Sequence, residues 1–131
     1  MKLRIKGNSI RLRLGRSEVR RLATEGIVEE ATTFGPGNQL NYALLASADE
    51  KRITATFVGP RIIICAPANV VEQWAGTDQI GIRTVQQSGD KELDILIEKD
   101  FECLEAPEGD SQEDAFARAE FGAGACPTPF N

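Results

Sequence analysis

Most of the positive charge of the chain lies in its first 21 residues, in a pattern that could hold an anion. Eight lysines and arginines stand there against Glu18 alone, which gives 8 − 1 = +7. Because the 131-residue chain carries −5, the other 110 residues carry −12. Such a split is typical either of a face that binds a polyanion or of internal pairing between the two ends.

Lys2, Arg4 and Lys6 alternate with apolar residues, so their side chains should project from one face of a strand. Acidic side chains alternate in the same way near residue 95, at Glu92, Asp94 and Glu98. If the two strands are neighbours, the charges pair across the sheet, and each pair contributes about 0.2–1 kcal/mol. The alternatives are a face for nucleic acid or another polyanion, and a contact with the acidic surface of a protein partner.

Residues that other chemistries require are missing. Histidine, the commonest general base and metal ligand, is absent. The three cysteines, Cys65, Cys103 and Cys126, form no CxxC pair, and neither a phosphate loop nor a nucleophile elbow occurs. We therefore expect a non-catalytic protein with no metal site and no cofactor.

The elements that must position the charged residues follow the same order twice. Alternation and turn residues predict a first set of strands at 2–6, 10–14, 27–34 and 39–46, and a second set at 53–58, 61–65, 80–86 and 91–98. A short helix lies inside each set: one capped by Ser17 and ended by Gly26, the other running from about Pro67 to Gly76. The predicted fold is mainly β with two short helices, an α+β class.

The two sets match at an offset of about 52 residues, which places Val19 on Val71 and Leu22 on Trp74. We interpret the match as an internal duplication, with repeat one at about 2–47 and repeat two at about 52–99. The alternative is a coincidence of common hairpins. Together the repeats should form a single domain over residues 1–103.

Residues 104–131 differ in composition and should form an acidic, partly disordered tail. Phe116, Phe121 and Phe130 are too apolar for a segment that only faces solvent. We expect them to dock either onto the domain or onto a partner.

The repeated unit resembles the AbrB and MazE swapped-hairpin families. Residues 4–14, RIKGNSIRLRL, resemble the MazE-type opening, and residues 61–76, RIIICAPANVVEQWAG, resemble the AbrB-type strand that runs through proline into a short helix. In those families two chains interlock into one barrel. The resemblance therefore implies a β-barrel supplied by one chain, a single-chain pseudo-dimer, over about residues 2–98.

In MazE-type antitoxins the basic N-terminal strands contact DNA. Carried over by position, the resemblance implies a duplex DNA interface and an antitoxin-like regulator; its residues would be Arg4, Lys6, Asn8, Ser9 and Arg13, with Lys2 and Arg11 as neighbours. The second half departs from the pattern, because it has Thr54, Thr56 and Arg61 and no Gly-Asn-Ser turn. Any DNA face would thus be one-sided.

An acidic C-terminal extension binds the toxin in the MazE comparison. The alternative function is therefore a protein-interaction module that acts through its acidic tail and binds no DNA.

The whole chain also resembles a family of small uncharacterised bacterial proteins that open MKxRIKGNSxRxRL and carry KDFxCL, here Lys99–Leu104. This resemblance implies no activity. No apolar run approaches the roughly 20 residues that span a membrane, and the N-terminus lacks the apolar stretch of a signal peptide. We expect a cytoplasmic protein with no membrane partner.

Overall fold

The structure is a computed structural model, and it describes residues 1–101 and Phe116. In this part of the chain the order strand–strand–helix–strand–strand occurs twice. The first set comprises β1 (Lys2–Lys6), β2 (Ser9–Leu14), α1 (Arg16–Glu25), β3 (Ile27–Gly35) and β4 (Asn38–Ser47). The second comprises β5 (Thr54–Val58), β6 (Arg61–Pro67), α2 (Ala68–Gly76), β7 (Gly81–Ser88) and β8 (Lys91–Lys99). The predicted class, mainly β with two short helices, is confirmed.

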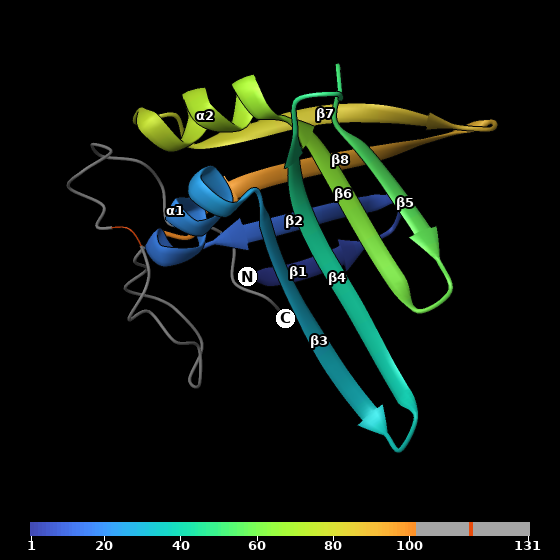
Figure 1. Cartoon of the computed structure of the whole chain (residues 1–131). Helices are drawn as coiled ribbons and strands as arrows, with labels where there is room; N and C mark the ends of the chain where they lie inside the picture. Colours follow the sequence, from blue (N-terminus) through green and yellow to red (C-terminus); the bar gives the residue numbers. More distant parts are fainter. Residues whose placement is uncertain (102–115, 117–131) are drawn as a thin grey trace.

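The strands form two four-stranded sheets, each of which combines one hairpin from each set. Sheet A has the order β1-β2-β8-β7, and sheet B has the order β3-β4-β6-β5. The two central pairs, β2 with β8 and β4 with β6, are parallel, whereas the hairpins are antiparallel. The strands of the two sheets run in clearly different directions, and both helices lie together at one end (Figure 1).

Neither sheet closes into the predicted barrel. In the part of the chain that the structure describes, β1 and β7 remain the edges of sheet A, and β3 and β5 remain the edges of sheet B. A barrel needs a backbone ladder between the first and last strands. Here side chains, and not a backbone ladder, join the edges of the two sheets.

Two sets of hydrogen bonds make these joins. Between β7 and β5, the Gln86 side chain accepts the Ala55 N–H at 2.7 Å and donates to the Ala55 carbonyl at 2.9 Å. Between β1 and the strands of sheet B, the Tyr42 hydroxyl donates to the Met1 carbonyl at 3.1 Å, and the Met1 amino group lies 3.1 Å from a Glu30 carboxylate oxygen. The two sheets therefore face each other as a sandwich with polar seams.

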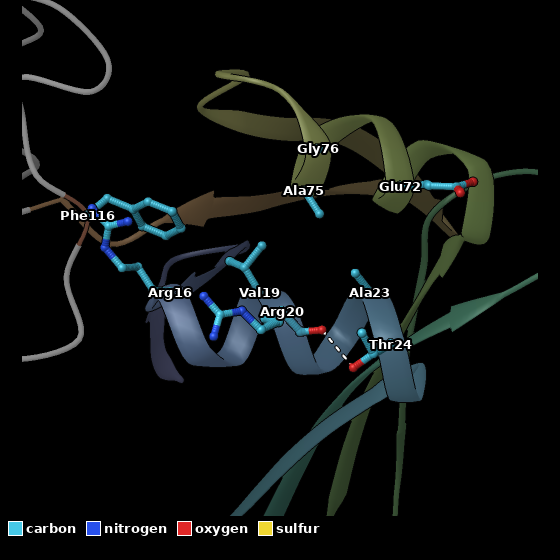
Figure 2. A pocket seen from close by; sticks show the side chains of 9 residues that line it. All are labelled: Arg16, Val19, Arg20, Ala23, Thr24, Glu72, Ala75, Gly76 and Phe116. Atoms are coloured by element: carbon cyan, nitrogen blue, oxygen red, sulfur yellow. Dashed lines mark hydrogen bonds between the residues drawn. The ribbon is translucent and has the colours of Figure 1, made fainter.

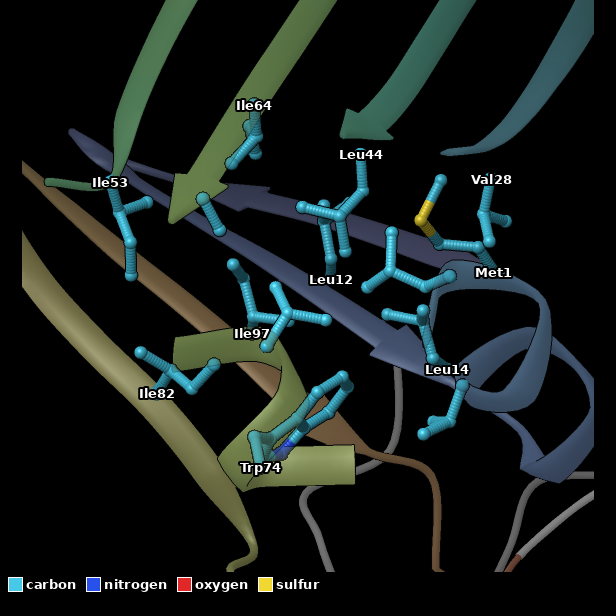
Figure 3. Packing of buried hydrophobic residues seen from close by; sticks show 14 of the residues in the cluster. Met1, Leu12, Leu14, Val28, Leu44, Ile53, Ile64, Trp74, Ile82 and Ile97 are labelled. Carbon is cyan, nitrogen blue, oxygen red and sulfur yellow. The ribbon is translucent and has the colours of Figure 1, made fainter. Parts of the chain in front are cut away.

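The core lies between the sheets and is sealed by the helices (Figure 3). Leu12 and Ile97 of sheet A, with Leu44 and Ile64 of sheet B, are each at most 1% exposed. Trp74 of α2 is 0% exposed and lies beneath its helix, and its indole N–H donates to the Ile80 carbonyl at 3.0 Å. Because a buried indole needs a hydrogen-bond acceptor, this bond fixes where the chain leaves α2.

Helix α1 begins two residues before the start that its predicted cap, Ser17, implies. Gly15 is the N-cap, and Ser17 lies inside the helix. The Glu18 carboxylate accepts the Gly15 N–H at 3.0 Å, so a side chain in the first turn of the helix satisfies the backbone N–H of the N-cap residue. The predicted end is confirmed, because Gly26 has φ 80° and donates its N–H to the Leu22 carbonyl.

Candidate functional site

The outer face of sheet A carries the cations of the first hairpin. The antiparallel register places Arg4 opposite Arg11 and Lys2 opposite Arg13. Because side chains alternate between the two faces of a strand, all four point away from the core, as does Lys6. We call these five residues the basic face.

Three of the five cations of the basic face lie beside an acidic side chain. Lys2 pairs with Asp100 at 2.9 Å, and Arg13 with Glu98 at 2.8 Å. Arg11 lies 3.6 Å from the same Glu98 carboxylate. The predicted pairing across the sheet therefore reaches Glu98 from β2 and not from β1, since β2 lies between β1 and β8.

The other acidic residues of β8 do not reach the basic face. Asp94 forms a two-point ion pair with Arg83 of β7, at 3.0 and 2.8 Å. The Arg83 guanidinium, through its hydrogen bonds, lowers the pKa of the Asp94 carboxyl. Glu92 accepts a hydrogen bond from Gln87 at 3.1 Å. Both carboxylates are therefore engaged by β7, on the far side of β8.

Arg4 and Lys6 differ from the rest of the basic face, because neither forms an ion pair within residues 1–101 and Phe116. Together with Ser9 and Arg11 they line a hollow of about 270 Å³. We call this hollow the cationic pocket. Like charges directly opposite each other destabilise a sheet, and Arg4 and Arg11 are such a pair. An anion in the cationic pocket would relieve their repulsion.

The Gly-Asn-Ser turn holds the hairpin and leaves few donors for a ligand. Gly7 has φ 55°, which favours glycine. The Asn8 side chain donates to the Glu92 carbonyl at 2.6 Å, and the Ser9 hydroxyl donates to the Lys6 carbonyl at 2.7 Å. The Asn8 amide and the Ser9 hydroxyl therefore stabilise the turn beside the cations. A ligand would be bound by the charged side chains.

Phe116 lies against the domain, at the mouth of a groove of about 420 Å³ between α1 and α2 (Figure 2). Its N–H donates to the Asp100 carbonyl at 2.7 Å, and its ring is 5.2 Å from the Arg16 guanidinium. Phe116 is 8% exposed, so this phenylalanine packs on the domain of its own chain. Phe121 and Phe130, for which docking was also predicted, lie outside the described residues.

Lys99 is a buried cation that the sequence reasoning did not single out. It is 1% exposed, its ammonium group donates to the Thr77 carbonyl at 2.7 Å, and it lies 5.8 Å from the Trp74 ring and 5.5 Å from the Phe116 ring. Burial lowers the pKa of its ammonium group. The sequence could have predicted that Lys99 faces the core, because Ile95 and Ile97 do so and the same alternation continues to residue 99.

The sequence also gave no sign of a third hollow, at the end of the sandwich away from the helices. It has a volume of about 580 Å³ and mostly apolar walls, and we call it the apolar groove. Its apolar lining comes from both sheets: Ile5, Ile10, Leu40, Phe57, Ile62 and Leu93. The alternation pattern assigns these inward residues to the core, but the sheets leave Ile5 59% and Phe57 72% exposed.

Neither a metal site nor a membrane-spanning helix occurs among the residues that the structure describes. No group of three or more histidine, cysteine, aspartate or glutamate side chains among them could hold a metal ion. None of the helices in this part of the chain has the length and apolarity needed to cross a membrane.

Comparison with known proteins gives a family but no activity. No curated protein and no solved structure matches the chain. The model of one family, described as a family of unknown function, matches residues 1–120, which include both sheets, the basic face and Phe116. The chain therefore belongs to the family of unknown function DUF7009.

Proposed function

We propose that this protein is a non-catalytic binding protein whose cationic pocket contacts the phosphates of a nucleic acid. The observation that carries the proposal is the state of Arg4 and Lys6. They line a hollow with Arg11 and Ser9, and no acidic side chain of the described residues pairs with either of them.

The local electrostatics favour an anion that can bridge neighbouring cations. Arg4 and Arg11 stand opposite each other on adjacent strands, and Lys6 lies two residues further along β1 on the same face. A guanidinium binds phosphate through two parallel hydrogen bonds, and an ammonium group adds a compact point charge. A phosphate backbone, with its regularly spaced negative charges, suits such a row better than a single carboxylate does.

The finer proposal is an AbrB/MazE-like regulator built from a duplicated unit. It is supported by the way in which each sheet takes one hairpin from each set. The turn glycines give further support, because Gly7 and Gly59 are 59 − 7 = 52 residues apart, as are Gly37 and Gly89 (89 − 37 = 52), and all four have positive φ. The cationic pocket has no equivalent on the second turn, so the proposed contact is one-sided.

The test is a titration with labelled duplex DNA at several salt concentrations. Each phosphate contact contributes a slope of about −0.9 to log affinity against log salt, so the double variant Arg4→Ala/Lys6→Ala should flatten the slope by about 1.8 and weaken binding at low salt. Arg61→Ala is the matched control, because Arg61 is an exposed arginine at the start of β6 and lies outside the pocket. It should leave the slope unchanged or nearly so.

Two outcomes would refute the proposal. One is the absence of affinity for any nucleic acid at about 50 mM salt, a concentration at which phosphate contacts are strong. The other is an equal effect of the double variant and of Arg61→Ala. The melting temperature of each variant is measured alongside, so that a loss of folding is not mistaken for a loss of binding.

A further inference from the structure

The apolar groove begins where the cationic pocket ends. Ser9 lines both hollows. On β1, Arg4 and Lys6 face the pocket while Ile5, between them, faces the groove. A ligand that places its charge in the pocket can therefore reach an apolar surface across the edge of a single strand.

We propose that the nucleic acid held by the cationic pocket is single-stranded, and that an unstacked base occupies the apolar groove. This inference rests on the proposed function and adds the class of nucleic acid. Charge complementarity selects the occupant: phosphates suit the unpaired cations, and a base suits the apolar walls behind them. In a duplex, bases are stacked inside the helix, so only a strand with free bases satisfies both surfaces.

Phe57 supplies the surface on which a base would stack. It stands on edge strand β5, is 72% exposed, and lines the groove together with Ile5 and the Gly-Asn-Ser turn. A large aromatic ring that is mostly exposed in a groove is a typical stacking platform for single strands. The volume of about 580 Å³ lies within the range of small-ligand sites, about 300–1,000 Å³, and is large enough for a nucleobase.

The polar groups around the groove indicate binding that tolerates different bases. The Gln86 amide is already occupied on both atoms by Ala55, and the Asn8 amide donates to the Glu92 carbonyl. The Ser9 hydroxyl proton is likewise given to Lys6. With these donors engaged, base edges are read weakly, and affinity should depend on stacking and phosphate contacts.

The experiment compares three probes of equal length, about ten nucleotides, which is within the usual range of single-strand sites. They are a single-stranded DNA, the corresponding duplex, and an abasic strand that keeps the sugar–phosphate backbone. The single strand should bind tightest. Phe57→Ala should weaken its binding by about 5- to 150-fold, the usual loss for one stacked base, and leave the abasic strand unaffected.

Phe34→Ala is the matched control. Phe34 is 73% exposed, nearly the same as Phe57, but it lies near the end of β3 and does not line the groove. It should leave binding of all three probes unchanged. Since both phenylalanines are mostly exposed, both variants should keep the fold, and melting temperatures check this.

The outcomes separate the two proposals. If the abasic strand or the duplex binds as tightly as the single strand, or if Phe57→Ala changes nothing, the base-in-groove inference is overturned while the phosphate contact stands. If no probe binds, the proposed function itself fails. If light scattering shows a dimer that Phe57→Ala dissociates, the groove is an interface between copies, and the inference is overturned in favour of that occupant.

Discussion

Replacing Gln86 by alanine should open the seam between β7 and β5. The Gln86 side chain makes two hydrogen bonds to one residue, accepting the Ala55 N–H at 2.7 Å and donating to its carbonyl at 2.9 Å. Each neutral hydrogen bond contributes about 0.5–1.5 kcal/mol, so Gln86→Ala should lower the free energy of unfolding by about 1–3 kcal/mol. Urea unfolding can be followed by the fluorescence of Trp74, the single tryptophan, which is fully buried.

Hydrogen exchange gives a more local readout. The Ala55 N–H points to Gln86 and away from β6, so its protection depends on this side chain. In Gln86→Ala the exchange of this amide should rise by about tenfold or more, as expected for the loss of roughly 1.4 kcal/mol. The amides of Thr54 and Thr56, which face β6 in an antiparallel ladder, should change less.

Gln87→Ala is the matched control. Its amide donates to Glu92 at 3.1 Å on the exposed side of the same hairpin, where substitutions usually change stability by less than about 0.5 kcal/mol. If Gln86→Ala and Gln87→Ala unfold at the same urea concentration, and Ala55 exchange is unchanged, Gln86 does not hold the seam.

Two further predictions concern the other seam and the backbone. Burial, followed by the hydrogen bond to Glu30, raises the pKa of Tyr42 from 10.0 to about 12. Its stabilising effect is therefore present below about pH 10 and lost as the pH rises through 12; an ultraviolet titration of the single tyrosine should show the high midpoint, and Glu30→Gln should lower it. Gly81→Ala should lower stability by about 1–3 kcal/mol, because the added Cβ would lie 3.0 Å from the Ile97 carbonyl oxygen. Gly76→Ala, with open space around its Cβ, should be neutral or stabilising by up to about 1 kcal/mol. Thermal unfolding of both variants measures the two changes, and an equal loss of stability in Gly76→Ala and Gly81→Ala would contradict this reasoning.

The order of the elements could be predicted because local signals specify it. The alternation in Lys2–Lys6 gives β1 with its observed bounds, and Gly26 ends α1 with positive φ, as its residue type suggests. The predicted start of α1 was wrong, also for a local reason. Glu18 satisfies the Gly15 N–H from inside the first turn, and this capping does not require a serine.

Strand pairing could not be predicted, because no local signal specifies which hairpins meet. The placement of β8 beside β2 depends on how both inner faces pack, and these faces come from residues more than 80 positions apart. The ion pairs follow from this placement: Glu98 meets Arg13 and Arg11, whereas Arg4 on the outer strand is left without an acidic partner in the described residues. The candidate site therefore exists because of a tertiary pairing that the alternation pattern does not contain.

The one-sided basic face also follows from the topology. The first hairpin, β1–β2, lies in sheet A, and its counterpart by order, β5–β6, lies in sheet B. Two identical chains sharing this fold would show the same hairpin on both sheets, and their outer faces would carry the same charge. In a single chain the two hairpins can differ, and they do. Sheet A presents Arg4 and Arg11 on its outer face, whereas the corresponding pair of the β5–β6 hairpin in sheet B is the uncharged Thr56 and Ile63. Joining both hairpins in one chain thus permits a binding surface on one sheet without requiring its repulsive duplicate on the other.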